Sequence, residues 1–500
     1  MTRRDLPLVL AIDAGGTAVK VALIDAFGRV EALQAAAVAT LHHPDGRVER
    51  DPVAFWQATA TAIRGLMQHA DAASRLVAVG CTGFGNGIFL VDGAGQPTRP
   101  CIVSVDHRAQ PLADRLHRDG RATLISQMNG QRIWGGQTVM QLAHLAETEP
   151  EVMAASRWAL SCKDYLRMCL TGTAATDPTD ASGGGLMDLN RASHSTEIWQ
   201  VLALPSLTPR LPPVVSSSAV AGRVNAAAAA QTGLPEGLPV ASGMMDVAAC
   251  ALGAGVTSSD RMVMIAGTWA INALEVQATT VNDPPILNML HRDGAARLVA
   301  EGSPSSAANL GWYIDRAMAG RMTMAEAMEA MARVPVAARR CRFLPYVHGP
   351  LPRQGTFIGL AASDDAGSMI RAICEAVAFQ HRRHAEEILR HADGHWPAAI
   401  RLTGGAARSP HWAQIFADVC GRPVEVVEAE EVGALGAAIC AAVAGGLYRD
   451  LGAASTAMCR IGRSHAPSKD HTALYEQGYK EFQRLDRGMM DLAAATSAPP

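Results

Sequence analysis

The sequence offers little that would draw the protein to nucleic acid or to a membrane. Its 500 residues include 44 Lys and Arg against 47 Asp and Glu, which gives a formal net charge of -3. A balance so close to neutral creates no basic field that would attract a polyanion. The longest uncharged apolar stretch, residues 432–448, is mostly Ala and Gly and falls short of the roughly 20 apolar residues that cross a bilayer. We therefore expect no nucleic-acid partner, no membrane segment and a cytoplasmic location.

Cysteine pairs that could bind a metal are missing as well. The ten cysteines are scattered, and none of them forms a C-x-x-C spacing, so the sequence indicates neither a zinc site nor a redox couple. Charged residues make up only 18% of the chain, while hydrophobic residues make up 49%. Such a composition favours a large core built from small residues and excludes disorder as the main state.

Two common nucleotide-binding motifs are also absent. The sequence contains no G-x-x-x-x-G-K-[ST], and residues 83–87, which read GFGNG, lack the spacing of G-x-G-x-x-G and the helix that such a motif opens. The absence of the glycine fingerprint disfavours a nicotinamide-dependent dehydrogenase. Any nucleotide site must therefore be built in another way.

What the sequence does contain is one pattern that occurs twice. An apolar run, a turn with Gly and Thr, and a second apolar run appear near the N-terminus and return in the second half of the chain. Runs at 8–12 and 19–24 flank the first turn (13–17), and runs at 262–266 and 270–274 flank the second (267–268). Two such hairpins predict two similar α/β domains, in agreement with a length that allows two or three domains. We place the boundary between residues 1–247 and 248–500.

Other segments predict regular elements around these hairpins. Expected helices are at residues 52–70, 138–147, 161–170 and 225–232, and expected strands are at 76–81 and 101–105. Tyr475, Tyr479, Phe482 and Leu485 recur at helical spacing and predict one closing helix. We expect the chain from residue 493 onward to be a frayed tail.

The tip of the first hairpin has the residues that a phosphate loop requires. Gly15 and Gly16 let backbone N–H groups approach an anion, the Thr17 hydroxyl can donate to a phosphate oxygen, and the Asp13 carboxylate can hold hydrated Mg²⁺. An ordinary tight hairpin also favours Asp and Gly. From the sequence alone the two interpretations stay open.

Two further glycine-rich sites lie in the second half. Gly267 and Thr268 form the tip of the second hairpin, and a pair of such tips would hold the phosphates of one nucleotide from two sides. Gly404 and Gly405 follow an apolar run and precede a Ser-Pro helix start, so that they can lie flat beneath an adenine ring. Taken alone, a junction of strand, glycine and helix is more often structural.

A single carboxylate, Asp246, precedes an apolar segment of small residues with helical spacing. Burial of a carboxylate is costly unless another group interacts with it. Asp246 can therefore serve as a helix N-cap or as a general base that accepts a proton from a substrate hydroxyl, and both interpretations remain open at this point.

These segments, in this order, resemble the FGGY carbohydrate kinases of the actin and hexokinase ATPase superfamily over essentially the whole chain. Further segments that carry the resemblance are residues 103–109, 163–166, 170–172, 176–177, 181–182 and 432–438. Residues 264–270, 301–304, 309–312 and 343–346 are most similar to L-xylulose kinases. The resemblance implies two ribonuclease H-like α/β lobes with the active site in a cleft between them. It implies sugar binding and the first phosphate loop in residues 1–247 and ATP binding in residues 248–500.

The resemblance also implies roles for single residues. Asp246 becomes the catalytic base and a substrate contact, and Asp13 and Asp246 hold Mg²⁺ through water. The implied ATP contacts are Asp13, Gly15, Gly16, Thr17, Lys20, Gly267, Thr268, Gly404, Gly405 and Ala406. The implied sugar contacts are Asp106, Arg108, Asn86, Phe84 and Trp134. A Trp is more often a core filler than a sugar contact, and both roles of Trp134 stay open.

One departure from the family pattern concerns substrate choice. Where D-xylulose kinases have Gln-Met-His, this chain has Phe84, Gly85 and Asn86. Phe cannot replace the hydrogen bonds of Gln, and Asn reaches less far than His. The change disfavours D-xylulose and indicates a substrate with one contact fewer or with another configuration.

We therefore expect ATP-dependent phosphorylation of a pentulose, with L-xylulose first and D-xylulose, ribulose or erythritol as alternatives. ATP and Mg²⁺ are the expected cofactors. An actin- or Hsp70-like ATPase without a sugar acceptor is the alternative from another class, but it would need no carboxylate such as Asp246. A homodimer is compatible with the resemblance, although no exposed apolar stripe in the sequence requires one.

Overall fold

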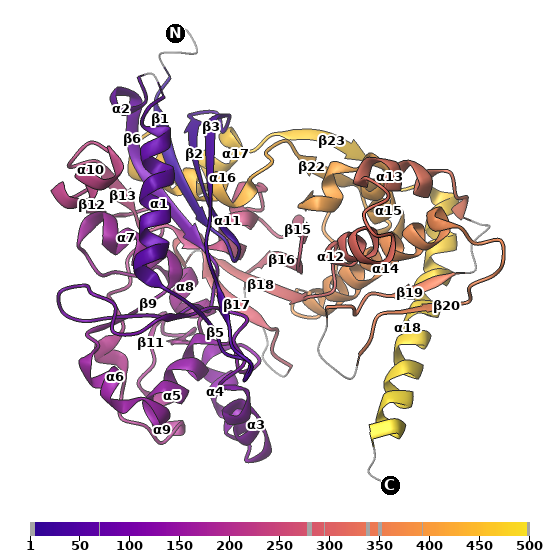
Figure 1. Cartoon of the computed structure of the whole chain (residues 1–500), viewed down its shortest axis with the longest axis horizontal. Helices are drawn as coiled ribbons and strands as arrows, with labels where there is room; N and C mark the ends of the chain where they lie inside the picture. The colour runs from indigo at the N-terminus through magenta and orange to yellow at the C-terminus, as the bar shows by residue number, and fades with distance from the viewer. Residues whose placement is uncertain are drawn as a thin grey trace. The chain divides into compact units, whose positions relative to one another are not determined.

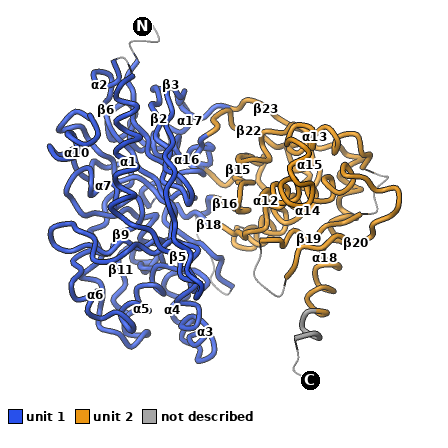
Figure 2. Tube along the Cα trace, viewed as in Figure 1, with its two compact units in different colours: residues 1–257, 275–299, 431–460 blue, residues 258–274, 300–430, 461–500 orange. Residues whose placement is uncertain are grey.

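The computed structural model describes residues 6–69, 71–277, 283–294, 296–336, 341–348, 353–392 and 394–497. Its chain forms two compact units, each assembled from separate segments (Figure 2). Unit 1 comprises residues 1–257, 275–299 and 431–460, and unit 2 comprises residues 258–274, 300–430 and 461–500. The proposed division of roles between residues 1–247 and 248–500 stays a prediction.

The sheet of unit 1 is built around the first hairpin. β1 (Leu8–Ala14) pairs antiparallel with β2 (Ala18–Asp25), so that Asp13 lies opposite Lys20. β6 (Leu76–Gly83) runs parallel to β1 on its other side. With β3 (Val30–Ala37), β12 (Val220–Arg223) and β13 (Pro239–Ala241), the strand order is β12-β13-β6-β1-β2-β3. The predicted first hairpin is confirmed.

The two faces of this sheet carry different helices. Even-numbered residues of β1, such as Leu10 and Ile12, pack into a core shared with α1 (Pro52–Leu66) and α7 (Cys162–Thr171). The opposite face lies against α16 (Val432–Ala444), where a Cβ on Gly80 would stand 2.1 Å from the Ala437 carbonyl oxygen. Because side chains alternate along a strand, Asp13 belongs to the α16 face.

Local sequence explains where the helices of unit 1 begin. Asp51 accepts hydrogen bonds from the backbone of Val53 and Ala54 at the start of α1, and Ser161 caps α7. Asn225 caps α10 (Ala226–Thr232), and Gly233, with φ of 77°, ends it. These are the residue types that satisfy free N–H groups and adopt left-handed backbone.

Unit 2 repeats the topology of unit 1. β15 (Arg261–Ala266) pairs antiparallel with β16 (Ala270–Val276) and parallel with β21 (Ala399–Thr403). β22 (Val424–Val427) is parallel to β21, and β23 (Ile461–His465) is antiparallel to β22. The order β16-β15-β21-β22-β23 therefore has the same strand directions as β2-β1-β6-β13-β12. The prediction of two similar α/β domains is confirmed (Figure 1).

Long helices complete unit 2. α14 (Ala366–Leu389) and α18 (Lys469–Ser497) pack through aromatic rings, with Tyr475, Tyr479 and Phe482 at centroid distances of 6.2, 5.8 and 5.6 Å from Phe379. This contact confirms the predicted closing helix.

The remaining elements connect these layers. In unit 1 they are β4 (Leu41–His42), β5 (Val48–Arg50), α2 (Ala72–Arg75), β7 (Phe89–Val91), β8 (Cys101–Ile102), α3 (Gln110–Arg118), α4 (Arg121–Asn129), α5 (Thr138–Thr148), α6 (Pro150–Ala155), β9 (Trp158–Leu160), α8 (Pro178–Gly183), β10 (Met187–Asp188), β11 (Ser193–His194), α9 (Glu197–Val201), β14 (Met244–Met245), α11 (Asp246–Gly253), β17 (Leu287–His291) and α17 (Leu451–Met458). In unit 2 they include α12 (Ala308–Trp312), α13 (Met324–Ala332), β19 (Arg342–Leu344), β20 (Thr356–Ile358) and α15 (Pro410–Cys420), and β18 (Ala296–Ser303) begins in unit 1.

Three expected boundaries were wrong. The helix expected to reach residue 70 ends at Leu66, and the strand expected at 101–105 ends at Ile102, where Asp106 N–H donates to the Val103 carbonyl and turns the chain. The expected tail from residue 493 is helical up to Ser497, and residues 498–500 lie outside the described part.

Candidate active site

Four charged side chains from distant parts of the sequence gather in unit 1. Asp13 lies near the end of β1, Lys20 in β2, Asp246 at the first position of α11, and Glu431 directly before α16. Lys20 Nζ lies 2.6 Å from Glu431 Oε2, while 40% of the Lys20 side chain remains exposed. Glu431 was not predicted, because nothing in the sequence pairs it with a residue 411 positions away.

Asp13 has an unusual electrostatic environment. Burial raises its pKa from 3.8 to about 7, and the negative charges of Asp246 and Glu431 add to this effect, while Lys20 opposes it. Its Oδ2 lies so close to the first turn of α16 that a Cβ on Gly433 would stand 2.5 Å away. Gly433 is therefore needed for the approach of this carboxylate to the helix.

Asp246 is oriented by backbone groups. Its Oδ1 accepts a hydrogen bond from Val247 N–H at 2.8 Å. Burial raises its pKa from 3.8 to about 6, partly offset by backbone N–H groups of Val247 and Gly85. The N-cap of α11 is Met245 without a side-chain capping bond, so the capping interpretation of Asp246 was wrong. The backbone interaction with Gly85 brings Asp246 to the turn at residues 84–86.

The first hairpin tip exposes backbone donors. Gly15 N–H donates to the Ala18 carbonyl at 3.0 Å, whereas no acceptor within the described residues takes the N–H of Gly16 or Thr17. The Gly16 carbonyl accepts a 2.5 Å hydrogen bond from Arg50 Nη2. An exposed turn with its carbonyl held inward and two N–H groups unbonded is suited to anion binding. Arg50 was not predicted from the sequence.

The turn at residues 84–86 is firmly placed. Phe84 is buried against Phe89 and against the guanidinium of Arg50, 5.5 Å from its ring centre. Asn86 adopts a φ of 58° and accepts a hydrogen bond from Thr138 N–H at 3.2 Å. Trp134 is half-buried on the segment that leads to Thr138. The structure thus brings the turn that carries Phe84 and Asn86 to Asp246 through the Gly85 backbone, while the Phe84 ring is buried in the core of unit 1. The substrate role expected for Phe84 and Asn86 stays a prediction.

Asp106 and Arg108 are engaged with each other instead. The Asp106 carboxylate is fully buried and accepts four hydrogen bonds, from Val48 N–H and from Arg108 N–H, Nε and Nη2. Although burial raises the pKa of Asp106, these bonds bring the net value below its ordinary range. Arg108 also donates to Glu49 at 2.8 Å. With its acceptor capacity filled, Asp106 is a poor receptor for a sugar hydroxyl, so the role expected for this pair stays an unsupported prediction.

The glycine-rich segments of unit 2 lie together within that unit. Thr268 is exposed at the tip between β15 and β16. Gly404, with φ of 88°, packs so tightly on the base of this tip that an added Cβ would lie 2.7 Å from the Ala266 carbonyl. Gly405 opens a short 3₁₀ turn that includes Ala406, and Ser409 then caps α15 by accepting from Trp412 N–H at 3.3 Å. The predicted junction of strand, glycine and helix is confirmed.

A buried ionic cluster supports the segment before Asp246. Lys163 Nζ lies 2.6, 3.0 and 3.0 Å from carboxylate oxygens of Asp164, Asp177 and Asp180. Arg167 donates to the Ser242 carbonyl at 2.9 Å and so ties α7 to the segment that leads to Asp246.

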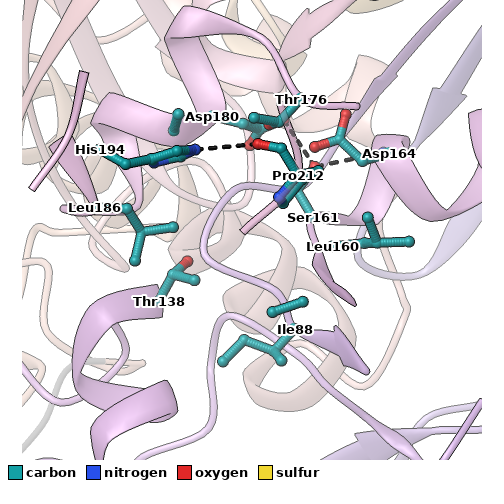
Figure 3. A pocket seen from close by; sticks show the side chains of 12 residues that line it. Ile88, Thr138, Leu160, Ser161, Asp164, Thr176, Asp180, Leu186, His194 and Pro212 are labelled. Atoms are coloured by element: carbon teal, nitrogen blue, oxygen red, sulfur yellow. Dashed lines mark hydrogen bonds between the residues drawn. The ribbon is translucent and has the colours of Figure 1, made fainter. Parts of the chain in front are cut away.

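A cavity of about 20 Å³ beside Ser161, Asp164 and Asp180 (Figure 3) has room for about one water molecule. It is therefore no substrate site.

The described residues give two further results. They contain no group of three or more His, Cys, Asp or Glu side chains arranged to hold a metal ion. No helix among them is long and apolar enough to cross a membrane.

Two α/β units of the same topology, each with an exposed Gly/Thr hairpin tip, define a kinase fold of the actin and hexokinase type. Models of the N-terminal and C-terminal domains of the FGGY family of carbohydrate kinases match residues 8–253 and 262–445. The chain belongs to this family and is a sugar phosphotransferase, as the sequence resemblance implied.

Individual relatives cover nearly the whole chain. The L-xylulose/3-keto-L-gulonate kinase of Escherichia coli (strain K12) is 32% identical over 95% of this chain and 96% of its own length. A probable L-xylulose kinase of Pasteurella multocida is 30% identical over 95% of this chain and 98% of its own. The crystal structure of xylulose kinase from Rhodospirillum rubrum, 27% identical, superposes with a TM-score of 0.86 and covers 97% of this chain and 100% of that chain.

Proposed function

We propose that this kinase transfers the γ-phosphoryl group of Mg·ATP to a primary hydroxyl of a pentulose, with L-xylulose as the first candidate. The observation that carries the proposal is the Asp246 carboxylate, which stands at the start of α11 beside the turn at residues 84–86. The names of the relatives, L-xylulose kinases, support the choice of sugar. The alternative, an actin- or Hsp70-like ATPase without a sugar acceptor, is disfavoured because the chain belongs to a family of carbohydrate kinases.

Asp246 has the properties of a general base. With a pKa of about 6, its carboxylate is ionised at neutral pH and yet more basic than an ordinary aspartate. Such a group aligns the acceptor hydroxyl and takes its proton as the phosphoryl group transfers. Phosphoryl transfer depends on positioning and charge stabilisation rather than on a covalent intermediate, so no nucleophilic side chain is required.

The carboxylate pair fits a divalent cation. The negative charge of Asp246 raises the pKa of Asp13, and a cation bound beside the two carboxylates would relieve this repulsion. Carboxylate oxygens are the ligands that Mg²⁺ prefers, usually with several waters retained. We propose that these two residues hold Mg²⁺ through water, and the ion would neutralise charge on the phosphates.

The nucleotide is assigned to the glycine-rich turns. We propose that Gly15, Gly16, Thr17 and Lys20 bind phosphate oxygens in unit 1, and that Gly267 and Thr268 do so in unit 2. Gly404, Gly405 and Ala406 would then support the adenosine. The unbonded N–H groups of Gly16 and Thr17 support the first of these assignments.

Substrate choice rests on the turn that faces the base. The Phe84 ring is buried in the core and has no hydrogen-bonding group, and the Asn86 carbonyl already accepts from Thr138, so this turn would offer a sugar few polar contacts. D-xylulose, ribulose and erythritol are the alternatives to L-xylulose. We propose Trp134 as a contact for the apolar face of the sugar. Asp106 and Arg108 bind each other, so we do not propose them as sugar contacts.

The test is sugar-dependent ADP formation. The enzyme is assayed with Mg·ATP against L-xylulose, D-xylulose, ribulose, erythritol and 3-keto-L-gulonate, with a no-sugar control for background hydrolysis. We expect the highest kcat/KM for L-xylulose. A clear preference for another member would correct the substrate, and no stimulation by any of them would refute the proposed function.

A further inference from the structure

A second concave site opens on unit 1, separate from the cluster around Asp246. The cavity measures about 500 Å³, within the range of small-molecule sites. Its walls come from α1, α7, α10, β9 and the turn at residues 93–97. α1 and α7 cover the face of the sheet opposite α16 and Asp13, so the cavity and the carboxylate pair lie on different sides of the sheet.

The walls of this cavity combine aromatic rings with neutral amide groups. Trp56, Trp158 and Tyr165 contribute the rings. Four carboxamides line it as well: Gln57, Gln96, Asn225 and Gln231. No Asp, Glu, Lys, Arg or His is among the lining residues that the structure describes.

The absence of charged lining residues restricts the chemical class of ligand that the cavity can bind. No lining side chain that the structure describes offers a cation to a phosphate or a carboxylate, or an anionic ligand to a metal ion. Arg157, which stacks on Trp158, is not among the lining residues and donates to the Pro209 carbonyl at 2.6 Å. The thiol of Cys169, which also lines the cavity, has its pKa raised to about 12 by burial, so it stays neutral and unreactive at physiological pH. A neutral polar molecule is the class that remains.

Several of the polar groups are held in place and keep hydrogen-bonding capacity. Gln231 Oε1 accepts from Trp56 Nε1 at 2.7 Å, which fixes α10 against α1 and leaves the amide NH₂ of Gln231 available. Asn225 Oδ1 accepts from Ala228 N–H at 2.8 Å, so its NH₂ is likewise available as a donor. Donors of this kind recognise hydroxyl oxygens.

The aromatic and loop walls are also ordered. The guanidinium of Arg157 stacks 3.7 Å from the ring centre of Trp158 and fixes the plane of that ring. The Asp92 carboxylate accepts the N–H groups of Ala94 and Gln96, both at 2.9 Å, and holds the turn that carries Gln96. An indole ring held in a fixed plane beside oriented amides forms a surface that suits the C–H faces and hydroxyl edges of a carbohydrate.

We propose that this cavity is a second, non-catalytic site that binds a neutral sugar or polyol. The proposal is independent of the reaction assigned to Asp246, because it rests on residues of the other face of the sheet. α7 lies between the two sites, since it lines the cavity with Tyr165 and donates from Arg167 to the Ser242 carbonyl.

The test measures binding and its location without turnover. Full-length enzyme, without ATP, is titrated with xylitol, D-glucose and L-xylulose by saturation-transfer NMR, and hydrogen–deuterium exchange maps the protected peptides. We expect saturable binding of at least one probe and slowed exchange in residues 162–172 and 226–232. The double variant Gln57→Ala/Gln96→Ala should weaken this binding about tenfold, as the loss of two hydrogen bonds implies.

A matched control and a second variant complete the experiment. Gln200→Ala removes an exposed helical Gln outside the cavity and should leave binding unchanged. Trp158→Ala should weaken binding as well, with catalytic-site protection around Asp246 unaffected. The proposal is overturned if no probe binds saturably, if protection is confined to peptides around Asp246, or if the double variant binds as the unchanged enzyme does.

Discussion

Arg50 lies fully buried beneath the first hairpin tip, and among the described residues no carboxylate pairs with it. Its Nη2 donates to the Gly16 carbonyl, and its guanidinium lies over the rings of Phe55 and Phe84. Because a trans peptide directs its C=O and N–H to opposite sides, a carbonyl held inward turns the Thr17 N–H outward. Arg50 thereby orients a donor toward the position proposed for phosphate.

Replacement of Arg50 should therefore weaken nucleotide binding more than catalysis. Arg50→Met keeps the apolar stem against the phenyl rings but removes the hydrogen bond. We expect KM for ATP to rise about tenfold, as the loss of one charge-assisted bond implies, with kcat within about twofold. Arg223→Met removes an exposed Arg that donates to the Gly237 carbonyl and serves as the control. An unchanged KM for ATP would contradict the role.

The carboxylate pair predicts a pH dependence of stability. The folded pKa of Asp13, about 7, exceeds its ordinary 3.8, so the folded state binds this proton more tightly than the unfolded state. The associated stability is present below pH 3.8 and is lost as the pH rises through 7. Asp13→Asn removes the charge, and we expect it to raise Tm by about 2 °C at pH 8 and to have little effect near pH 4. Calorimetry of the ligand-free protein checks this, and a lower Tm at pH 8 would contradict it.

At the scale of elements, the carboxylate site depends on two helices that cross closely. α11 carries Asp246 and packs against α16, whose first turn meets Asp13. Gly436 and Gly253 make the approach of their backbones possible, since an added Cβ would lie 2.0 Å from the Ala249 carbonyl oxygen or 2.3 Å from that of Val432.

A side chain at this crossing should destabilise unit 1. Gly436→Ala forces the helices apart, and we expect a loss of about 2 kcal/mol or more in the free energy of unfolding, measured by urea denaturation. Gly488→Ala is the matched control, because Gly488 lies in helix α18 with open space around it and should gain up to about 1 kcal/mol. Equal stability of the two variants would rule out the tight crossing.

Elements with a local signal could be predicted from the sequence. The hairpins at residues 8–24 and 262–274 follow from apolar runs interrupted by Gly and Thr, and α18 follows from aromatic spacing. The length of the strand that begins at Cys101 was overestimated, because the turn that ends it depends on a backbone hydrogen bond from Asp106 N–H to the Val103 carbonyl. Apolar composition alone does not reveal such a bond.

The site was predictable in part for a related reason. Asp13, Gly15, Gly16 and Thr17 lie within five consecutive positions, so the role that we propose for them could be inferred from the motif. Glu431 and Arg50 join the same region only after the sheet and α16 have packed, and their contacts are set by tertiary structure. The family motif implies that Asp106 and Arg108 bind the sugar, but in the structure Arg108 donates to the Asp106 carboxylate. This ion pair occupies the groups that a sugar hydroxyl would need.

At the level of the complete chain, the repeated strand topology explains why the fold could be predicted. Each unit places an antiparallel hairpin beside parallel strands, and each exposes a Gly/Thr turn at the hairpin tip. In unit 1 the carboxylates of Asp13 and Asp246 join this common topology, so the two units share strand directions and differ in the side chains near the hairpin tip. The near-neutral net charge fits this arrangement, because the phosphates would be met by local N–H groups, Lys20 and a cation rather than by a basic surface.

We propose Asp246 as the general base of this sugar kinase, and sugar-dependent ADP formation by Asp246→Asn is the sharpest test of that role. We predict that kcat falls at least about a hundredfold, while ATP binding measured by calorimetry and the unfolding transition stay close to those of the unchanged enzyme. Asp114→Asn, an exposed aspartate on α3, should retain full activity. Unchanged turnover of the best sugar by Asp246→Asn would show that Asp246 is not the base.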